Sequence, residues 1–219
     1  YKTVFFTLGI LQIILGLSMI APILTQFFYD ELDSGFISSG IVTVIFGILF
    51  LLSNLDHDKK ISLPQAFLLT ALSWLSIAIF GSLPFIFSEI NLSATDAFFE
   101  SMSGITTTGS TIITNLNETP KSILLWRGML QWLGGIGIIV MAITLMPLMN
   151  IGGMQLFIIS TSDTPEKILP RSKEIALRLI LVYSGLTFIC ALFYKIFGMN
   201  FFDSFVHSMT TIATGGFSN

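Results

Sequence analysis

Charged residues are scarce in this 219-residue sequence, in which Asp, Glu, Lys and Arg together make up 11%. Soluble domains carry about 25% charged residues, so a soluble globular fold is excluded. The ten basic side chains do not outnumber the thirteen acidic ones and form no basic stripe, which excludes a nucleic-acid-binding protein. The only cysteine, Cys190, lies in an apolar stretch and excludes a disulfide framework.

Long uncharged runs are present instead, and they cover residues 3–29, 34–55, 61–88 and 128–162. About 20 apolar residues are enough to span a bilayer core. We therefore predict an all-α polytopic membrane protein with spans near 3–28, 34–52, 63–87, 122–146 and 174–197. In the first span, Gly9 and Gly16 allow close contact with another helix, and Pro22 predicts a kink.

Basic residues in the loops predict the orientation of the spans. Alternating spans put seven basic residues on the side of the N-terminus and three on the other: Lys2, Lys59, Lys60, Lys167, Arg171, Lys173 and Arg178 against Lys121, Arg127 and Lys195. This asymmetry predicts a cytoplasmic N-terminus in the cytoplasmic (inner) membrane. On the outer side, Trp126 beside Arg127 is typical of an interface anchor.

Two segments, 96–117 and 203–219, are too polar for spans and are rich in Ser, Thr and Gly. Aligned at an offset of 107, residues 96–112 and 203–219 share seven of seventeen residues, at 96/203, 98/205, 101/208, 102/209, 105/212, 107/214 and 109/216. Irregular backbone at membrane depth is tolerated only where protein buries it or where it lines a watery cavity. The sequence therefore predicts an internal repeat of span, re-entrant segment and span.

Each re-entrant segment begins with a pattern that is typical of a helix start. Ser93 with Asp96, and Asn200 with Asp203, are pairs of the capping-box type, with Asp in place of Glu or Gln. The acid in the first turn also complements the positive end of the helix. We predict that Asp96 and Asp203 act in helix caps and not as ion ligands.

The two short helices are expected to end near Ile105 and Ile212, where the carbonyl end of a helix favours a cation. The residues that follow, 106–109 and 213–216, are small and contain glycine. Their backbone can present carbonyl oxygens that replace the hydration shell of an ion. We call these two stretches the predicted filter segments.

The arrangement resembles the Trk/Ktr/HKT superfamily of potassium transport proteins, most closely its bacterial TrkH branch. The similarity lies in ESMSGITTTGST (100–111), HSMTTIATGGFSN (207–219), the helix LLWRGMLQWLGGIGIIVMAITLMPLMNIGGMQLF (124–157) and the helix pair before residue 60. The resemblance implies a chain about twice this length, with four pore units around one axis, so this sequence is expected to be an N-terminal part. It implies filter glycines at Gly109 and Gly216, and glycine at the first position points to potassium.

The resemblance implies a site of eight residues that bind the transported potassium ion: Thr106, Thr107, Thr108, Gly109, Ala213, Thr214, Gly215 and Gly216. The expected division is a helix pair (1–55), a first pore repeat (61–159), a cytoplasmic link (160–173) and a second repeat (174–219). Expected partners are membrane lipid, a second copy in a homodimer and a cytoplasmic nucleotide-binding regulatory subunit. No cofactor besides the transported ion is expected.

Two other classes of function stay open from the residues alone. A secondary transporter with repeated broken helices could bind a small ionic substrate. An intramembrane enzyme would need a reactive pair, for which Glu100 and His207 are the candidates because they occupy equivalent repeat positions. We favour packing behind the filter for both residues, and we predict that the chain is not an enzyme.

Overall fold

The computed structural model describes residues 1–31, 33–56, 61–149 and 168–217, and the secondary structure in these residues is helical. The helices are α1 (Lys2–Ser18), α2 (Ile20–Tyr29), α3 (Gly35–Ser53), α4 (Leu63–Phe87), α5 (Ala94–Ile105), the 3-10 helix η1 (Leu116–Glu118), α6 (Lys121–Met149), α8 (Ile168–Ile196) and α9 (Phe201–Ile212). The described residues contain five helical segments long and apolar enough to cross a membrane, at Lys2–Tyr29, Gly35–Ser53, Leu63–Phe87, Lys121–Ile139 and Glu174–Ile196. The predicted five-span, all-helical fold is confirmed at this level.

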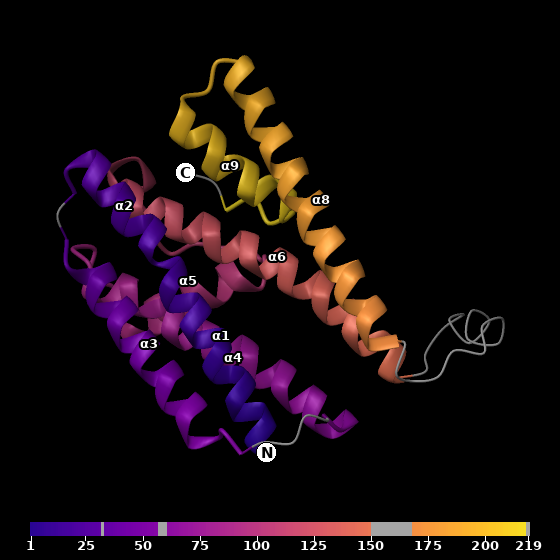
Figure 1. Ribbon diagram of the computed structural model, residues 1–219. Coiled ribbons are helices and arrows are strands. Elements are labelled where there is room, and N and C mark those ends of the chain that lie inside the picture. Colours follow the sequence, from indigo (N-terminus) through magenta and orange to yellow (C-terminus); the bar gives the residue numbers. More distant parts are fainter. Residues whose placement is uncertain (32, 57–60, 150–167, 218–219) are drawn as a thin grey trace.

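Helix α6 divides the molecule into two groups of helices (Figure 1). Helices α1 to α5 gather on one side of α6, and α8 with α9 lies on the other. In the predicted cytoplasmic link, 160–173, residues 160–167 lie outside the described residues. Residues 168–173 form the start of α8. Helix α6 is therefore the element that both short helices, α5 and α9, can contact.

Helices α1 and α3 pack closely through small residues. A Cβ atom on Gly9 would come within 2.7 Å of the Gly47 carbonyl oxygen, and one on Gly16 within 2.6 Å of a Val44 methyl group. Glycine at these positions lets the two backbones approach. The predicted contact roles of Gly9 and Gly16 are confirmed.

The first span bends at Met19, between α1 and α2. Pro22 has no N–H to donate to the Ser18 carbonyl four residues earlier, and its ring crowds that carbonyl. The backbone tightens there, with Met19 N donating to Gly16 O at 3.2 Å. The predicted kink is confirmed, and it lies about one turn before the proline.

The acidic loop between α2 and α3 caps the start of α6. The Glu31 carboxylate accepts hydrogen bonds from the backbone N of Lys121 (2.7 Å) and from N and Oγ of Ser122 (3.1 Å each). An anion at a helix N-terminus is favourable because it satisfies free N–H groups and complements the helix dipole. The N-terminal helices are thereby attached to α6, against which both short helices pack.

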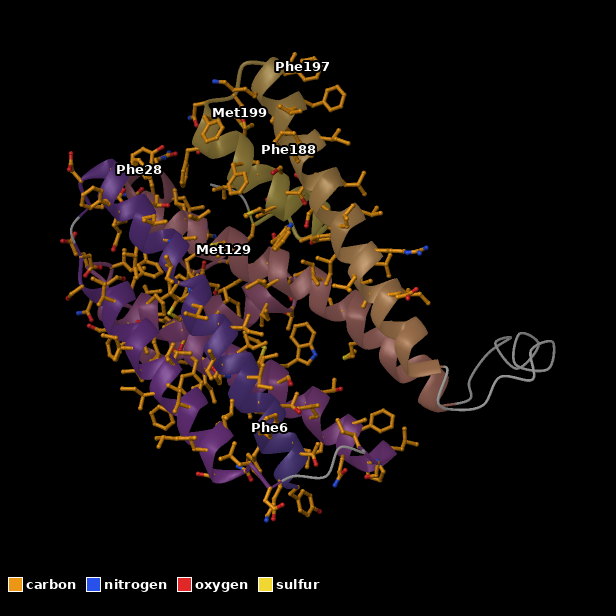
Figure 2. All side chains as sticks on the ribbon, in the orientation of Figure 1. Phe6, Phe28, Met129, Phe188, Phe197 and Met199 are labelled. Atoms are coloured by element: carbon orange, nitrogen blue, oxygen red, sulfur yellow. The ribbon has the colours of Figure 1, made fainter. Side chains whose placement is uncertain are left out.

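The largest buried apolar cluster brings residues of α1, α3, α4 and α5 against α6: Leu15, Met19, Phe36, Phe85, Ala97, Ile123, Trp126 and Leu130. Met129 packs against this cluster and also against a second one that includes Val206 of α9. Figure 2 shows Met129 between the two groups of helices, whereas Phe188 of α8 and Phe197, which directly follows α8, are exposed. The apolar interior of the described residues is therefore centred on α6.

Candidate functional site

The two short helices have the predicted limits and equivalent caps. Helices α5 and α9 are each 12 residues long. The Ser93 hydroxyl accepts a hydrogen bond from Asp96 N (3.2 Å), and the Asn200 side-chain oxygen accepts one from Asp203 N (2.8 Å). Because the acceptors and donors stand 107 residues apart, the repeat found in the sequence is also a repeat of structure.

Each predicted filter segment contains two residues in the left-handed region. The φ angles are +57° at Thr107 and +78° at Gly109, and +62° at both Thr214 and Gly216. Glycine adopts such angles without strain, whereas a β-branched residue does so rarely. Sequence reasoning identified the glycines and missed the threonines, because nothing in a threonine side chain favours a positive φ.

The backbone N–H groups of both segments fold back onto the helix ends. Residue 107 donates to Gly104 O (2.9 Å), and residues 108 and 109 donate to Ser103 O (3.0 and 3.4 Å). Residues 214, 215 and 216 repeat this pattern on Thr211 O (2.9 Å) and Thr210 O (3.2 Å each). In the described part of the chain, no hydrogen bond reaches the carbonyl oxygens of 106–109 or 213–216. The backbone N–H groups of both segments are therefore satisfied at the helix ends, whereas their carbonyl oxygens remain available to bind another group.

The two predicted filter segments lie side by side. A Cβ atom on Gly109 would collide with the Gly215 carbonyl oxygen, and one on Gly215 would come within 2.7 Å of the Thr107 carbonyl oxygen. Available carbonyl oxygens from both repeats are thus gathered in one place. Such oxygens are suitable ligands for a weakly hydrated cation.

A buried ion pair contacts the residues that follow the two predicted filter segments. Arg127 Nε donates to Glu100 Oε1 at 2.8 Å, and both side chains are 0% exposed. The same carboxylate accepts hydrogen bonds from Thr111 Oγ1 (2.8 Å) and Ile112 N (3.0 Å). The Arg127 guanidinium lies 3.9 Å from the centroid of the Phe217 ring. The pair therefore connects α5, α6 and the residues that follow both segments.

The predicted interface anchor is wrong. Trp126 and Arg127 are both 0% exposed, so neither side chain faces a membrane surface. Trp126 Nε1 donates to the Gly81 carbonyl oxygen (2.9 Å), and Arg127 is held by Glu100. Apolar packing and a buried partner hold these two residues inside the protein, where the sequence pattern alone suggested an interface.

Glu100 and His207 do not form the pair that an enzyme would need. Glu100 is paired with Arg127, whereas the half-buried His207 ring lies 6.3 Å from the ring of Tyr194 on α8. For Glu100, the favoured interpretation of packing behind the segments agrees with its contacts.

Helix α6 contacts the ends of both short helices through adjacent glycines. A Cβ atom on Gly134 would collide with the Ile105 carbonyl oxygen, and one on Gly135 would lie 3.3 Å from Ala213 Cα and would collide with the Tyr183 hydroxyl. Glycine at these two adjacent positions lets α6 pack directly against the C-terminal ends of both α5 and α9.

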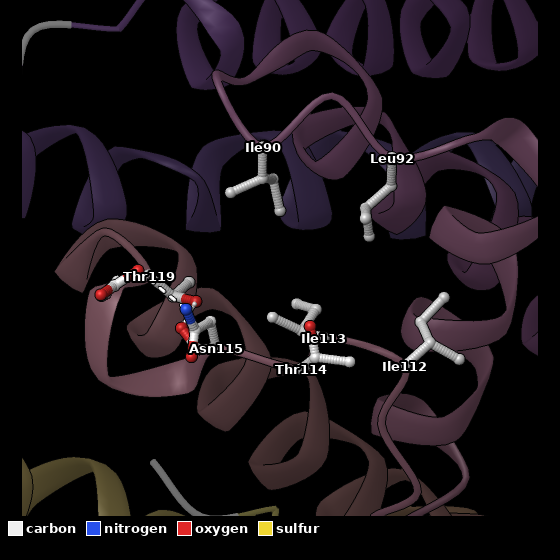
Figure 3. Close-up of a pocket in the computed structure, with 8 residues that line it drawn as sticks. Ile90, Leu92, Ile112, Ile113, Thr114, Asn115 and Thr119 are labelled. Carbon is white, nitrogen blue, oxygen red and sulfur yellow. Dashed lines mark hydrogen bonds between the residues drawn. The ribbon is translucent and has the colours of Figure 1, made fainter.

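A cavity of about 280 Å³ lies beside the stretch that leads from Gly109 to α6. In Figure 3, Ile90 and Leu92 of the α4–α5 loop face Ile112 and Ile113 across it. The other lining residues are Thr114, Asn115, Glu118 and Thr119, and Thr119 Oγ1 donates to Asn115 O (3.0 Å). The cavity includes none of the predicted filter residues.

Comparison with known proteins agrees with this architecture. A family model described as a cation transport protein, TrkH, matches residues 33–219. The chain belongs to the TrkH family. Membership of a transport family agrees with the prediction that the chain is not an enzyme.

Several members of the TrkH family resemble the chain over almost its whole length. A Trk system potassium uptake protein, TrkI, of Halomonas elongata is 40% identical and covers 97% of the chain, which spans 43% of that protein. The TrkH protein of Escherichia coli is 42% identical, with coverage of 96% and 44%. The crystal structure of the potassium transporter TrkH from Vibrio parahaemolyticus gives a TM-score of 0.88 at 38% identity, with coverage of 99% and 44%. The chain thus spans less than half the length of these TrkH-family relatives.

Proposed function

We propose that the two predicted filter segments line a cation pathway and that the cation is potassium, taken up across the cytoplasmic membrane. The proposal is carried by one observation: both segments use their N–H groups within the helix ends and leave their carbonyl oxygens available. The potassium-binding residues would be Thr106, Thr107, Thr108, Gly109, Ala213, Thr214, Gly215 and Gly216.

Two features support a cation over an anionic substrate. The segments follow the C-terminal ends of α5 and α9, which carry the partial negative charge of the helix dipole. Anion sites on broken helices use N-terminal ends instead. Curated relatives that are about 40% identical carry the name potassium uptake protein.

The membrane potential is a sufficient driving force for inward movement of potassium. It contributes about 2.3 kcal/mol per unit charge for each 100 mV. We place the N-terminus in the cytoplasm and divide the chain into 1–55, 61–159, 160–173 and 174–219, as the sequence predicts. The remaining pore units would come from chain beyond residue 219 or from another chain. A homodimer with a cytoplasmic nucleotide-binding regulatory subunit is the proposed assembly.

The experiment that tests the proposal is rubidium or potassium uptake by the full-length protein that carries this chain. The host cells lack their other potassium uptake systems, and an empty vector gives the background. We expect uptake above the vector and growth at low potassium. Uptake equal to that of the vector, with the protein present in the membrane, would reject the proposed function.

The substitution Gly109→Ser tests the segments themselves. The added side chain would meet the Gly215 carbonyl oxygen in a backbone with φ +78°, so carbonyl directions must change. We expect a clear loss of potassium preference over sodium, about tenfold for each 1.4 kcal/mol of lost discrimination. Ser101→Ala is the control because Ser101 is buried against Gly81 of α4, behind the segments. Unchanged selectivity in Gly109→Ser at normal expression would mean that 106–109 is not the filter.

A further inference from the structure

Gln131 of α6 lies behind both predicted filter segments. Its side chain is 0% exposed, and its Oε1 accepts a hydrogen bond from Phe217 N at 3.0 Å. A Cβ atom on Gly215 would collide with Gln131 Nε2, and one on Gly109 would lie 3.5 Å from it. A single carboxamide thus touches the second segment and reaches the first.

The nitrogen of this carboxamide is a buried donor without an acceptor among the described residues. A buried donor in that condition is unfavourable, and nearly all such groups in proteins have partners. The carbonyl oxygens of Thr107 and Gly215 border the same Cβ positions of Gly215 and Gly109 that Nε2 borders, and they accept no hydrogen bond in the described residues either. An unsatisfied donor therefore stands beside the oxygens proposed to bind the ion.

The residue type at position 215 is explained by the same contact. Gly215 is not among the residues with a positive φ, so its backbone does not require glycine. The equivalent position of the first repeat is occupied by Thr108. What distinguishes Gly215 is the Gln131 carboxamide, which fills the space that a side chain would need.

We propose that Gln131 is a positioning residue for ion selectivity. Its oxygen holds the Phe217 amide, and its nitrogen sets the direction of the carbonyl groups where Thr107 and Gly215 meet. Nε2 has no acceptor among the described residues, so a carbonyl group that turned to accept its N–H would become a weaker ligand for the cation, and this side chain thereby adjusts how strongly the filter binds the ion. The inference rests on the proposed function, because it concerns the same carbonyl oxygens.

The test compares Gln131→Met with Gln12→Met in the full-length protein. Gln12 is the matched control because it is also 0% exposed, but it lies on α1 and donates to Ser76 Oγ of α4. Rubidium uptake is measured against rising sodium. We expect Gln131→Met to lower the potassium-to-sodium preference about tenfold, which corresponds to 1.4 kcal/mol, and Gln12→Met to leave it unchanged. A purely structural role would reduce protein amount and uptake of both ions together and leave their ratio as it was.

If the unaltered protein takes up rubidium and Gln131→Met leaves the potassium-to-sodium preference unchanged, this inference alone is overturned. Absence of uptake by the unaltered protein overturns the proposed function and the inference with it. If Gln131→Met does not accumulate, Gly215→Ala is compared with Gly215→Ala combined with Gln131→Ala. We expect the single change to abolish uptake and the combination to restore part of it, because the colliding carboxamide is gone. Uptake by the combination no higher than that of Gly215→Ala overturns the inference.

Discussion

The buried pair of Glu100 and Arg127 gives the prediction with the largest expected effect. Glu100→Gln keeps the shape of the side chain and removes its charge. The Arg127 guanidinium, which is 0% exposed, then loses the negative charge of the carboxylate that its Nε contacts at 2.8 Å. The amide also weakens the hydrogen bonds that the carboxylate accepts from Thr111 Oγ1 and Ile112 N.

The structure allows an estimate of the size of this effect. Removing one partner of a fully buried ion pair costs about 3–5 kcal/mol, because the other partner stays buried and loses that attraction. Folded proteins are stable by about 5–15 kcal/mol in total, so Glu100→Gln should remove a large part of the stability. Thr111 and Ile112 follow the first predicted filter segment closely, so lower selectivity is expected as well.

The assay is the melting temperature of the purified full-length protein in detergent, followed by size-exclusion chromatography after heating. Glu89→Gln is the control, because Glu89 is exposed in the α4–α5 loop. Combining Glu100→Gln with Arg127→Met removes both charges and should melt at a higher temperature than Glu100→Gln alone. If Glu100→Gln folds and has the same melting temperature as the unaltered protein, the view that this pair stabilises the site is refuted.

Two further substitutions test contacts of α6. Glu31→Gln weakens the cap on the first backbone amides of α6 and should cost about 1 kcal/mol, seen as a lower melting temperature, whereas the exposed neighbour Asp30→Asn should melt normally. Gly134→Ala drives a methyl group into the Ile105 carbonyl oxygen and should cost about 1–3 kcal/mol or more. Gly185→Ala, with nothing within 4 Å of the added atom, should accumulate and melt as before. Equal behaviour within either pair would contradict the contact concerned.

Patterns that depend on neighbours in the chain were predictable from the sequence. Hydrophobic length predicted the five spans, and the Ser93 and Asn200 caps predicted the starts of α5 and α9. The repeat at an offset of 107 predicted that two short helices would end in equivalent turns. These features are local, or copies of a local feature, so a single sequence contains them.

Contacts between distant residues were not predictable in the same way. Arg127 was assigned to a membrane surface because it stands next to Trp126 near the start of an apolar run. Its partner, Glu100, lies 27 positions earlier on another helix. The available signal was energetic: an arginine at the start of a span needs an acid if it is buried, and Glu100 lies in the re-entrant segment directly before that span. Pattern reading treats each charge alone and therefore misses a pair.

The two repeats agree in their backbone and differ in their side-chain surroundings, and this difference follows from the position of α6. The left-handed residues and the N–H bonds recur at an offset of 107, because each segment terminates the same kind of helix. One α6, however, serves both segments, and its Gln131 carboxamide lies against residue 215. The first segment can therefore carry Thr108 where the second needs glycine. A sequence repeat indicates equal backbones, whereas the residues that break the repeat indicate where a single shared helix makes the two halves unequal.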